Sequence, residues 1–565
     1  MMLEIAIWEH VYDPFGSPLL STLAAMTPLV TLLGLLAFAG WPAHRAALAG
    51  LAVALVVAVV GAGMPADAAL AAALAGACFG LFPIGWIIIG AMFLFRLSVE
   101  AGALEVMKRS VTSLSADQRL QALLIAFSFG SFLEGAAGFG APVAISAALL
   151  VGAGFPAVEA ACLALVANTA PVAFGALGTP IITLAKVTGL DEQAVSALAG
   201  RQLPLFSLIV PAWMVCMMGG WRSLGGVWPA VLVCGASFAA VQFVVSNLLG
   251  AALVDVAGGI VSLVALAVFL RWWRPRSIWR YDTEPGAAET TRDEACAAPP
   301  AARIAWAWTP WAVLSLTVFC WGLPPVKAAL EGRHPAAAAW LPASVVAPEF
   351  SVPRLDQRVA KVPPATRGRR EVERAVYRCN WLSAAGTALL LAAVFAVPWL
   401  GISWRRAAVL WLDNLRRLGG ALLTIAAMLA LAFVTRYAGT DVTLGLALTH
   451  TGSFYPFCAA LLGWLGVALT GSDTSSNAMF GSLQRVTAEQ LGLDPLLICT
   501  ANSTGGVMGK MIDAQSIVVS ATATGSRRTE GVILRRVFPH SVVLAALVGL
   551  LVWLQSGMLS WMVPG

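Results

Sequence analysis

Long apolar stretches separated by short charged ones dominate this chain. A helix needs roughly 20 apolar residues to cross a bilayer core of about 30 Å, and ten stretches approach that length. They lie at about 18–40, 46–63, 68–97, 203–220, 226–247, 252–270, 305–323, 381–402, 419–437 and 538–556. The pattern predicts an all-α polytopic membrane protein.

The basic residues predict which loops face the cytoplasm, because Lys and Arg are enriched on that side. Four short basic stretches mark this side, at 98–120, 271–280, 405–417 and 527–536. The region 324–380 is also basic, but long loops escape this bias, and we predict a folded or loosely folded external loop. Acidic residues precede the first apolar run and Arg45 follows it, so the N-terminus is expected outside. The start lacks the basic residues of a signal peptide.

Four further segments are too rich in glycine and polar residues to be plain crossings. They are 121–153, 157–187, 454–485 and 495–523. The loop assignments require one segment of each pair to cross the membrane and the other to return to its own side. We therefore expect about 12 crossings, two re-entrant hairpins and both termini outside.

The two irregular pairs are entered from opposite sides, as in an inverted repeat with broken helices. Asn168 and Asn502 are each predicted to start a break, and each has a glycine seven residues later, at Gly175 and Gly509. The first membrane half then covers 1–270, including the motifs at 121–187. It is followed by a cytoplasmic linker at 271–303, a transmembrane helix at 304–323, the external loop at 324–380 and a second membrane half at 381–565, including the motifs at 454–523.

Composition narrows the class of protein. Hydrophobic residues make up 59% and charged residues 11%, whereas a soluble domain carries about 25% charged residues. This excludes a soluble, disordered or nucleic-acid-binding chain despite the net charge of +6. The nine cysteines form no CxxC pair, so we expect neither a metal site nor a cofactor. No nucleophile–base pattern indicates an enzyme.

The broken segments indicate a buried site for a small anion. Non-helical backbone at membrane depth survives only inside protein or beside a wet cavity, and the amides freed at a new helix start suit an anion. Asn, Ser and Thr side chains in these segments add neutral hydrogen bonds. The alternative is that the glycines serve only close helix packing.

Charged groups in these segments have two or more interpretations each. Glu134 could carry a proton or cap freed amides, and Asp473 could bind a coupling cation, cap a half-helix or carry a proton. Lys510 could face a substrate carboxylate, although an internal pair with Asp513 is a serious rival. Asp255, near the start of a crossing, is expected at the outer interface.

At these residues the chain resembles the bacterial L-lactate permease family over nearly its whole length. The most specific matches are FLEGAAGFGAPVAI at 132–145, NTAPVAFGA at 168–176, GSDTSSN at 471–477 and NSTGG at 502–506. Others are YDP at 12–14, FPIGWIII at 82–89, DQRLQ at 117–121, GRQLP at 200–204 and GKM at 509–511. One departure follows Lys510: family members usually read Ile-Ser-Pro-Gln where this chain has Ile512-Asp-Ala-Gln.

The resemblance implies a transporter of the bacterial cytoplasmic (inner) membrane. It implies uptake of L-lactate, and of D-lactate or glycolate, with a proton; a sodium-coupled carrier of a related small carboxylate is the alternative. The oligomeric state stays open. We expect proton coupling at Glu134 or Asp473. Expected substrate-binding residues are Gly135, Gly138, Gly140, Asn168, Thr169, Ser472, Asn477, Asn502, Ser503, Thr504, Gly505 and Lys510.

Overall fold

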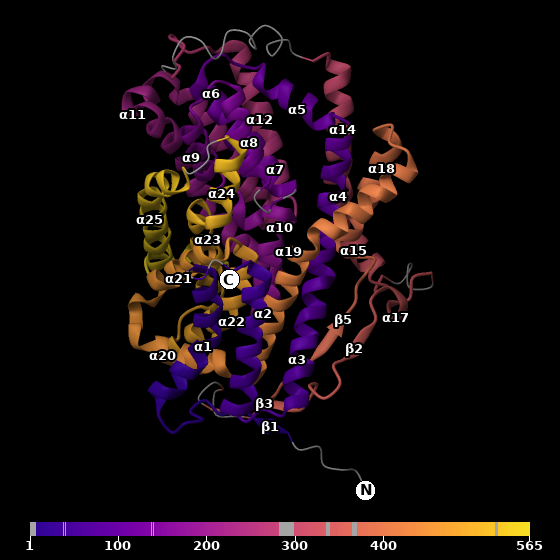
Figure 1. Ribbon diagram of the computed structural model, residues 1–565, viewed down its shortest axis with the longest axis vertical. Helices are drawn as coiled ribbons and strands as arrows, with labels where there is room; N and C mark the ends of the chain where they lie inside the picture. The colour runs from indigo at the N-terminus through magenta and orange to yellow at the C-terminus, as the bar shows by residue number, and fades with distance from the viewer. Residues whose placement is uncertain are drawn as a thin grey trace.

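The computed structural model describes residues 7–564, apart from 38, 40, 137, 139–140, 282–298, 335–339, 364–365, 367–369 and 526–528. Helices form most of it (Figure 1). Gly140 and the middle of the predicted linker lie outside the described residues.

Apart from strand β1 (Trp8–Glu9), the regular structure of the first half of the chain is helical. Its helices are α1 (Pro18–Ala37), α2 (Ala43–Val56), α3 (Ala66–Phe79), α4 (Trp86–Glu100), α5 (Ala103–Thr112), α6 (Gln118–Ala122), α7 (Gly130–Ala136), α8 (Ala141–Gly152), α9 (Ala157–Ala167), α10 (Gly175–Thr188), α11 (Glu192–Leu248) and α12 (Val254–Trp272). Short helical turns η1 (Val57–Gly61), η2 (Gly80–Gly85), η3 (Leu123–Phe129) and η4 (Val172–Phe174) join some of them.

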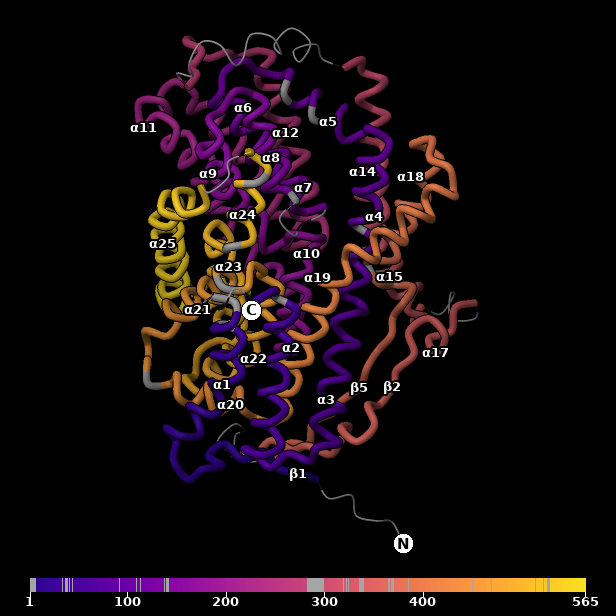
Figure 2. The backbone as a smooth tube through the Cα atoms, viewed as in Figure 1, coloured from indigo at the N-terminus to yellow at the C-terminus, as the bar shows by residue number. Residues whose placement is uncertain are grey.

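The second half contains helices and the other short strands, β2 to β5, whose bounds are given below. Its helices are α14 (Ala301–Gly322), α15 (Pro324–Leu330), α17 (Ala343–Val346), α18 (Ala385–Trp399), α19 (Trp404–Ala438), α20 (Thr440–Leu448), α21 (Tyr455–Thr470), α22 (Asp473–Leu491), α23 (Pro495–Gly509), α24 (Ala514–Ala523) and α25 (Glu530–Gln555). The turns are η5 (Thr449–Phe454), η6 (Lys510–Ile512) and η7 (Ser560–Met562). Figure 2 traces the path between them.

Seven helices in the described residues are long and apolar enough to cross a membrane, or eight if the bent pair at 157–188 counts as one span. Other expected crossings form shorter apolar helices, at 18–32 and 386–399. The expected crossings at 203–220 and 226–247 are parts of the single helix α11. Its backbone kinks at Gly219–Gly220, where Gly220 has a φ of +70°.

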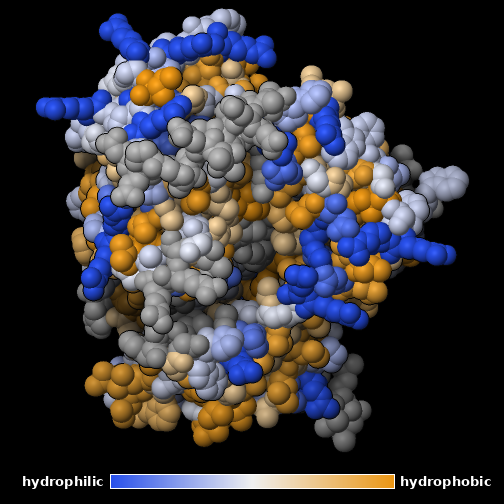
Figure 3. All heavy atoms as spheres, turned by 45° about the horizontal axis from the view of Figure 1, so that its top comes forward, coloured by the Kyte–Doolittle hydropathy of each residue, from blue (hydrophilic) through white to orange (hydrophobic). Residues whose placement is uncertain are grey.

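The outer surface is suited to lipid. Large apolar side chains point outward from many helices, including Leu19, Val60, Leu74, Leu248 and Leu550. Figure 3 shows hydrophobic residues over much of the lower surface, with hydrophilic residues gathered at the top and on the right. An outward apolar surface of this kind would aggregate in water and is stable in a bilayer. The chain is a multi-pass membrane protein.

The region 324–380 forms two small sheets rather than a purely helical structure. Strand β3 (Val359–Lys361) pairs in parallel with β1 (Trp8–Glu9) and antiparallel with β4 (Glu371–Val372). Strand β2 (Glu349–Ser351) pairs antiparallel with β5 (Val376–Arg378). The N-terminal segment and the region 324–380 therefore lie on the same side of the molecule.

A buried ion pair joins three loops elsewhere in the fold. Arg119 contacts Asp117 at 2.7 Å and donates to the carbonyls of Ser223 and Ser277. The amide of Trp279 donates to the Asp117 carboxylate at 3.0 Å. The basic loop 98–120, the kink region of α11 and the segment after α12 thus lie together, which agrees with the prediction that 98–120 and 271–280 face the same side.

A buried histidine, His10, directly follows strand β1 and lies outside the membrane-spanning helices. The pKa of His10 is lowered to about 4 because burial disfavours the charged ring; Glu373 opposes this shift and Lys361 adds to it. The unfolded chain then binds a proton between pH 6.5 and 4 that the folded chain does not. The contribution of His10 to stability is complete above pH 6.5 and is lost as the pH falls.

We therefore predict that acidification loosens this strand. Between pH 7 and pH 5 the thermal unfolding midpoint of the wild type should fall more than that of His10→Gln, because glutamine does not titrate. The expected difference corresponds to about 2 kcal/mol. Equal falls for the two proteins would contradict the prediction.

Candidate functional site

The first glycine-rich segment breaks as predicted. Helix α7 ends at Ala136 and α8 begins at Ala141, with Gly138 between them at a φ of +58°. Gln118, at the start of α6, donates to the carbonyl of Ala153 just after α8. The start and the end of the segment 118–153 therefore lie together, and the break near Gly138 forms the tip of the hairpin between them.

The second segment also breaks where Asn168 predicts. Helix α9 ends at Ala167, and the chain bends by 64° before α10. Proline at 171 has no amide hydrogen to continue a helix. Three successive residues, Ala176, Leu177 and Gly178, then have φ values of 43°, 59° and 73°. Left-handed backbone at non-glycine residues is strained and clusters at functional sites.

The third segment forms two antiparallel helices joined at Gly471. This glycine has a φ of +72° and ends α21, and the Ser472 side chain caps the start of α22. The Tyr455 hydroxyl at the start of α21 donates to Gln484 on α22 at 2.7 Å. The irregular segment predicted at 454–485 thus has its break at Gly471, with Asp473 in the first turn of the new helix.

The prediction that a break starts at Asn502 is wrong. Helix α23 continues through Asn502 to Gly509, and the chain leaves the helix only at 510–513. The glycines in this stretch serve close packing instead, since a Cβ at Gly505 would lie 2.1 Å from the Ala460 carbonyl oxygen. A Cβ at Gly509 would likewise lie too close to the Trp464 carbonyl oxygen, at 2.3 Å.

We predict that Gly505→Ala lowers the thermal unfolding midpoint in detergent, because the added methyl forces α21 and α23 apart. Overpacking of this kind costs about 1–3 kcal/mol. The matched control is Gly419→Ala in α19, where a Cβ would meet nothing within 4 Å. Equal midpoints for the two variants would show that the helices can separate without cost.

A buried polar network surrounds Asp473. Its Oδ2 accepts hydrogen bonds from Ser503 at 2.5 Å and from Asn477 at 3.4 Å. Asn502 donates to Asn477 at 2.9 Å, and Asn477 donates to the Pro180 carbonyl at 3.2 Å. The contact of Asn477 with Pro180 joins α22, in the second irregular pair of segments, to α10, in the first pair. The two predicted regions therefore meet.

Lys510 is already paired within its own segment. Its Nζ lies 3.2 Å from Asp513 Oδ2 and donates to the Gly471 carbonyl at 2.6 Å. Both side chains are buried. The internal ion pair with Asp513, which was the alternative interpretation of this lysine, is therefore observed. The Lys510 ammonium group also lies beside the turn that starts α22, through its bond to the Gly471 carbonyl.

Glu134 lies near this lysine. It is buried, its Oε2 has no hydrogen-bond partner among the described residues, and Asn168, Lys510 and Asp513 are near enough to act on it. A Cβ at Gly175 would lie 2.7 Å from its Oε1. Similarly, a Cβ at Gly506 would lie 2.4 Å from Asp473 Oδ1. Each buried carboxylate thus rests against a glycine of the broken segment that follows it.

Other predicted residues have structural contacts. Thr169 donates to the Val166 carbonyl, and Thr504 donates to Gln202 at 2.7 Å. Gly135 and Gly138 lie at close packing contacts, beside Asp255 and Ala176 respectively. These contacts leave their substrate-binding roles as predictions.

The prediction that Asp255 lies at the outer interface is wrong. Only 1% of its surface is exposed. A Cβ at Gly135 would lie 2.7 Å from the Asp255 Cβ, because α7 and α12 cross here at very close range. The position of Asp255 near the start of a predicted helix suggested the outer membrane interface. The close contact between α7 and α12 instead buries the start of α12.

Several site residues were not predicted from the sequence. Gln484 donates to Asn502 at 3.2 Å, Gln202 donates to Gln555 at 2.6 Å, and Gly175 and Gly506 accommodate the two carboxylates. The glutamines carried a usable signal, because an uncharged polar side chain within an apolar helix needs a partner.

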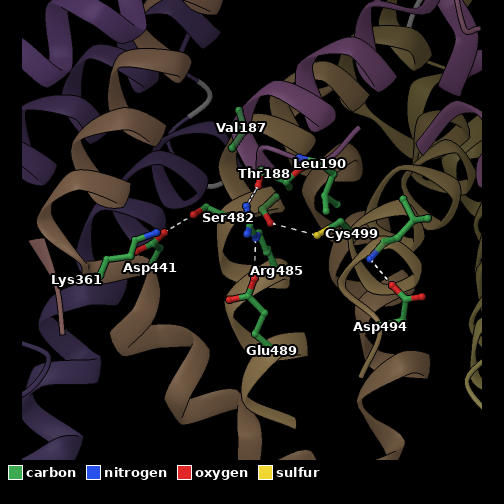
Figure 4. Close-up of polar contacts among 12 residues, drawn as sticks. Val187, Thr188, Leu190, Lys361, Asp441, Ser482, Arg485, Glu489, Asp494 and Cys499 are labelled. Atoms are coloured by element: carbon green, nitrogen blue, oxygen red, sulfur yellow. Dashed lines mark hydrogen bonds and ion pairs between the residues drawn. The ribbon is translucent and has the colours of Figure 1, made fainter. Parts of the chain in front are cut away.

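A second polar cluster holds the far end of α10 (Figure 4). Arg485 on α22 donates to the Thr188 carbonyl and pairs with Glu489 at 2.7 Å, and Arg436 on α19 donates to the Val187 carbonyl at 3.3 Å. Arginines suit the last carbonyls of a helix. The end of α10 is thus fixed to two helices of the second half, and Lys361, Glu371 and Ser482 line the adjoining pocket.

Comparison with known proteins places this arrangement in a family. The family model described as L-lactate permease matches residues 21–559. The chain belongs to the L-lactate permease family. Membership agrees with the resemblance of its motifs and identifies a transporter family rather than a family of enzymes.

Relatives of known name extend over the whole chain. An L-lactate permease of Bacillus subtilis is 45% identical over 99% of this chain and 100% of its own length. An L-lactate permease of Escherichia coli is 42% identical over 99% and 100%. The glycolate permease GlcA of Escherichia coli is 43% identical over 97% and 98%. The names of these relatives thus contain two related 2-hydroxy acids, lactate and glycolate.

Proposed function

We propose that this protein imports L-lactate, and the related D-lactate or glycolate, across the bacterial cytoplasmic membrane together with a proton. The observation that carries the proposal is the match to L-lactate and glycolate permeases along essentially the entire chain. All three acids carry one carboxylate and one hydroxyl, and they differ only by a methyl group or its configuration.

The buried polar region supplies chemistry suited to such an anion. The first turn of α22 begins at a capped break, so its helix dipole presents partial positive charge. Lys510, although paired with Asp513, places a cationic group beside that turn. We assign the carboxylate to this region, with Asn168, Asn477, Asn502 and Ser503 as partners for the carboxylate and hydroxyl oxygens.

The coupling proton is assigned to one of two buried carboxylates, Glu134 or Asp473. A monocarboxylate is charged at neutral pH, and moving one uncompensated charge against 100 mV costs about 2.3 kcal/mol. A proton that travels with the substrate removes this cost. A carboxylate that is buried beside the substrate can take up that proton and release it on the other side.

The membrane arrangement is part of the proposal. We assign the segments 118–153 and 455–491 as re-entrant hairpins and the two broken segments after them as crossings, within about 12 crossings in all. The adjacent ends of each hairpin support this assignment. Pairing of β1 with β3 places the N-terminus beside the region 324–380, and we assign that side to the exterior, with the C-terminus also outside.

Counterflow into proteoliposomes tests the substrate class without depending on the coupling ion. Vesicles loaded with unlabelled L-lactate should take up labelled L-lactate transiently, and internal D-lactate or glycolate should support the same exchange. Internal succinate, which carries a second carboxylate, should not. Exchange with succinate alone, or with none of these acids, would contradict the proposed substrate.

A further inference from the structure

A second buried carboxylate, that of Asp255, lies close to the segment of α7 that carries Glu134. Asp255 is in the first turn of α12, and neither of its carboxylate oxygens has a hydrogen-bond partner among the described residues. Carboxylates that are buried without hydrogen bonds or a counter-ion are strongly destabilised in their charged form. A side chain of this kind in a transporter requires an explanation beyond packing.

Glycines bring Asp255 to Glu134. Gly135 follows Glu134 directly and contacts Asp255, and Gly259, one turn further along α12, contacts the backbone of Phe132. A Cβ at Gly259 would lie 2.5 Å from the Phe132 amide nitrogen. Helices α7 and α12 therefore cross at backbone contact, and the segment of α7 that carries Glu134 rests on Asp255.

The broken segment before α10 reaches the same place. A Cβ at Gly178 would lie 2.6 Å from the Cβ of Ala251, four residues before Asp255, and Gly175 contacts Glu134 itself. Glu134 and Asp255 are thus carried by segments of α7 and α12 that meet each other and the left-handed backbone at 176–178. A change in that backbone would reach both carboxylates at once.

The charges around the pair do not neutralise it. Of the elements packed against α12, namely α7, α10, α11 and η3, only α7 contributes a charged group that acts on Asp255 within the described part of the chain, and that group is Glu134. Lys510 and Asp513 act on Glu134, but Lys510 is paired with Asp513 at 3.2 Å. Two neighbouring carboxylates without their own cation hold a shared proton more readily than two negative charges.

We propose that Glu134 and Asp255 together form the proton-binding site of this transporter, with Asp255 as an unrecognised second carboxylate. A proton from one side of the membrane binds a carboxylate oxygen of the pair, and the same O–H bond breaks to release it on the other side. The inference rests on the proposed proton-coupled function and adds to it the residue that shares the proton with Glu134.

The test compares wild type with Asp255→Asn and Asp255→Ser in proteoliposomes. A neutral side chain mimics the protonated acid, so both variants should fold and bind substrate. A pH gradient of one unit should hold about ten-fold accumulation of lactate in the wild type and almost none in either variant. Lactate counterflow should fall much less and should lose its dependence on pH. Ser262→Ala, a buried change on the same helix, is the control that keeps wild-type accumulation.

The other outcomes are also decisive. Wild-type accumulation in both Asp255 variants would overturn the inference and leave the proposed function intact. Failure of both variants to fold would overturn it as well, because it would mean that an anion is required there. If only a sodium gradient drives wild-type uptake and the variants abolish it, the pair is a sodium site instead. Absence of any pH-driven accumulation in the wild type would refute the proposed coupling and the inference together.

Discussion

Replacement of Glu134 by glutamine is expected to abolish lactate accumulation driven by a pH gradient. Glutamine has nearly the same shape as glutamate but cannot bind and release a proton. In the wild type a one-unit gradient should sustain about ten-fold accumulation for one proton per substrate, and in Glu134→Gln the ratio should fall to about one. Labelled lactate uptake into proteoliposomes measures this ratio.

Glu159→Gln is the matched control for this variant. Glu159 is a partly exposed carboxylate that pairs with Arg536. Its replacement removes a partly exposed ion pair, which typically contributes about 0–1 kcal/mol, and should leave the accumulation ratio unchanged. Full accumulation by Glu134→Gln would remove Glu134 from the coupling site and leave Asp473 as the predicted carrier.

Loss of Lys510 is expected to weaken lactate binding by about ten-fold or more, because one buried cation beside the α22 turn stabilises the substrate carboxylate. Lys510→Met alone would also leave Asp513 buried without its partner, at a cost of about 3–5 kcal/mol. The informative variant is therefore Lys510→Met/Asp513→Ser, which removes both charges together. Affinity is measured from the lactate concentration dependence of counterflow.

Asp513→Ser is the control for the double variant. It leaves Lys510 buried with its hydrogen bond to the Gly471 carbonyl but without its ion-pair partner. It also removes the carboxylate that accepts from the Ser516 amide, a bond that a serine hydroxyl can accept in its place. We expect its lactate affinity to equal or exceed that of the wild type. If the double variant binds lactate as well as the wild type does, the lysine serves only its ion pair and the counter-charge assignment is wrong.

Sequence patterns identified the parts of the site that depend on local chemistry. Pro171 and the glycine at 471 break helices for reasons contained in a few neighbouring residues. Glu134, Asp473 and Lys510 stand out because charge is costly in an apolar segment. The structure brings these three groups into one region through the contact of Asn477 with the Pro180 carbonyl.

Features that depend on distant packing could not be read from the sequence. Glycine in an apolar helix can mark a break or a close contact, and at Gly505 it marks contact with α21. Asp255 is buried by glycines on α7 and α12 that are more than a hundred residues apart in sequence. The pairing of β1 with β3 joins segments about 350 residues apart, and no local pattern indicates such a partner.

The central claim is that protons drive the uptake of a small 2-hydroxy acid by this protein. The most direct measurement is accumulation of labelled L-lactate in sodium-free proteoliposomes with an inward proton gradient, compared with a sodium gradient at equal pH on both sides. We predict accumulation of about ten-fold per pH unit under the proton gradient and none under the sodium gradient. Accumulation under the sodium gradient alone, or under neither gradient, would contradict the account.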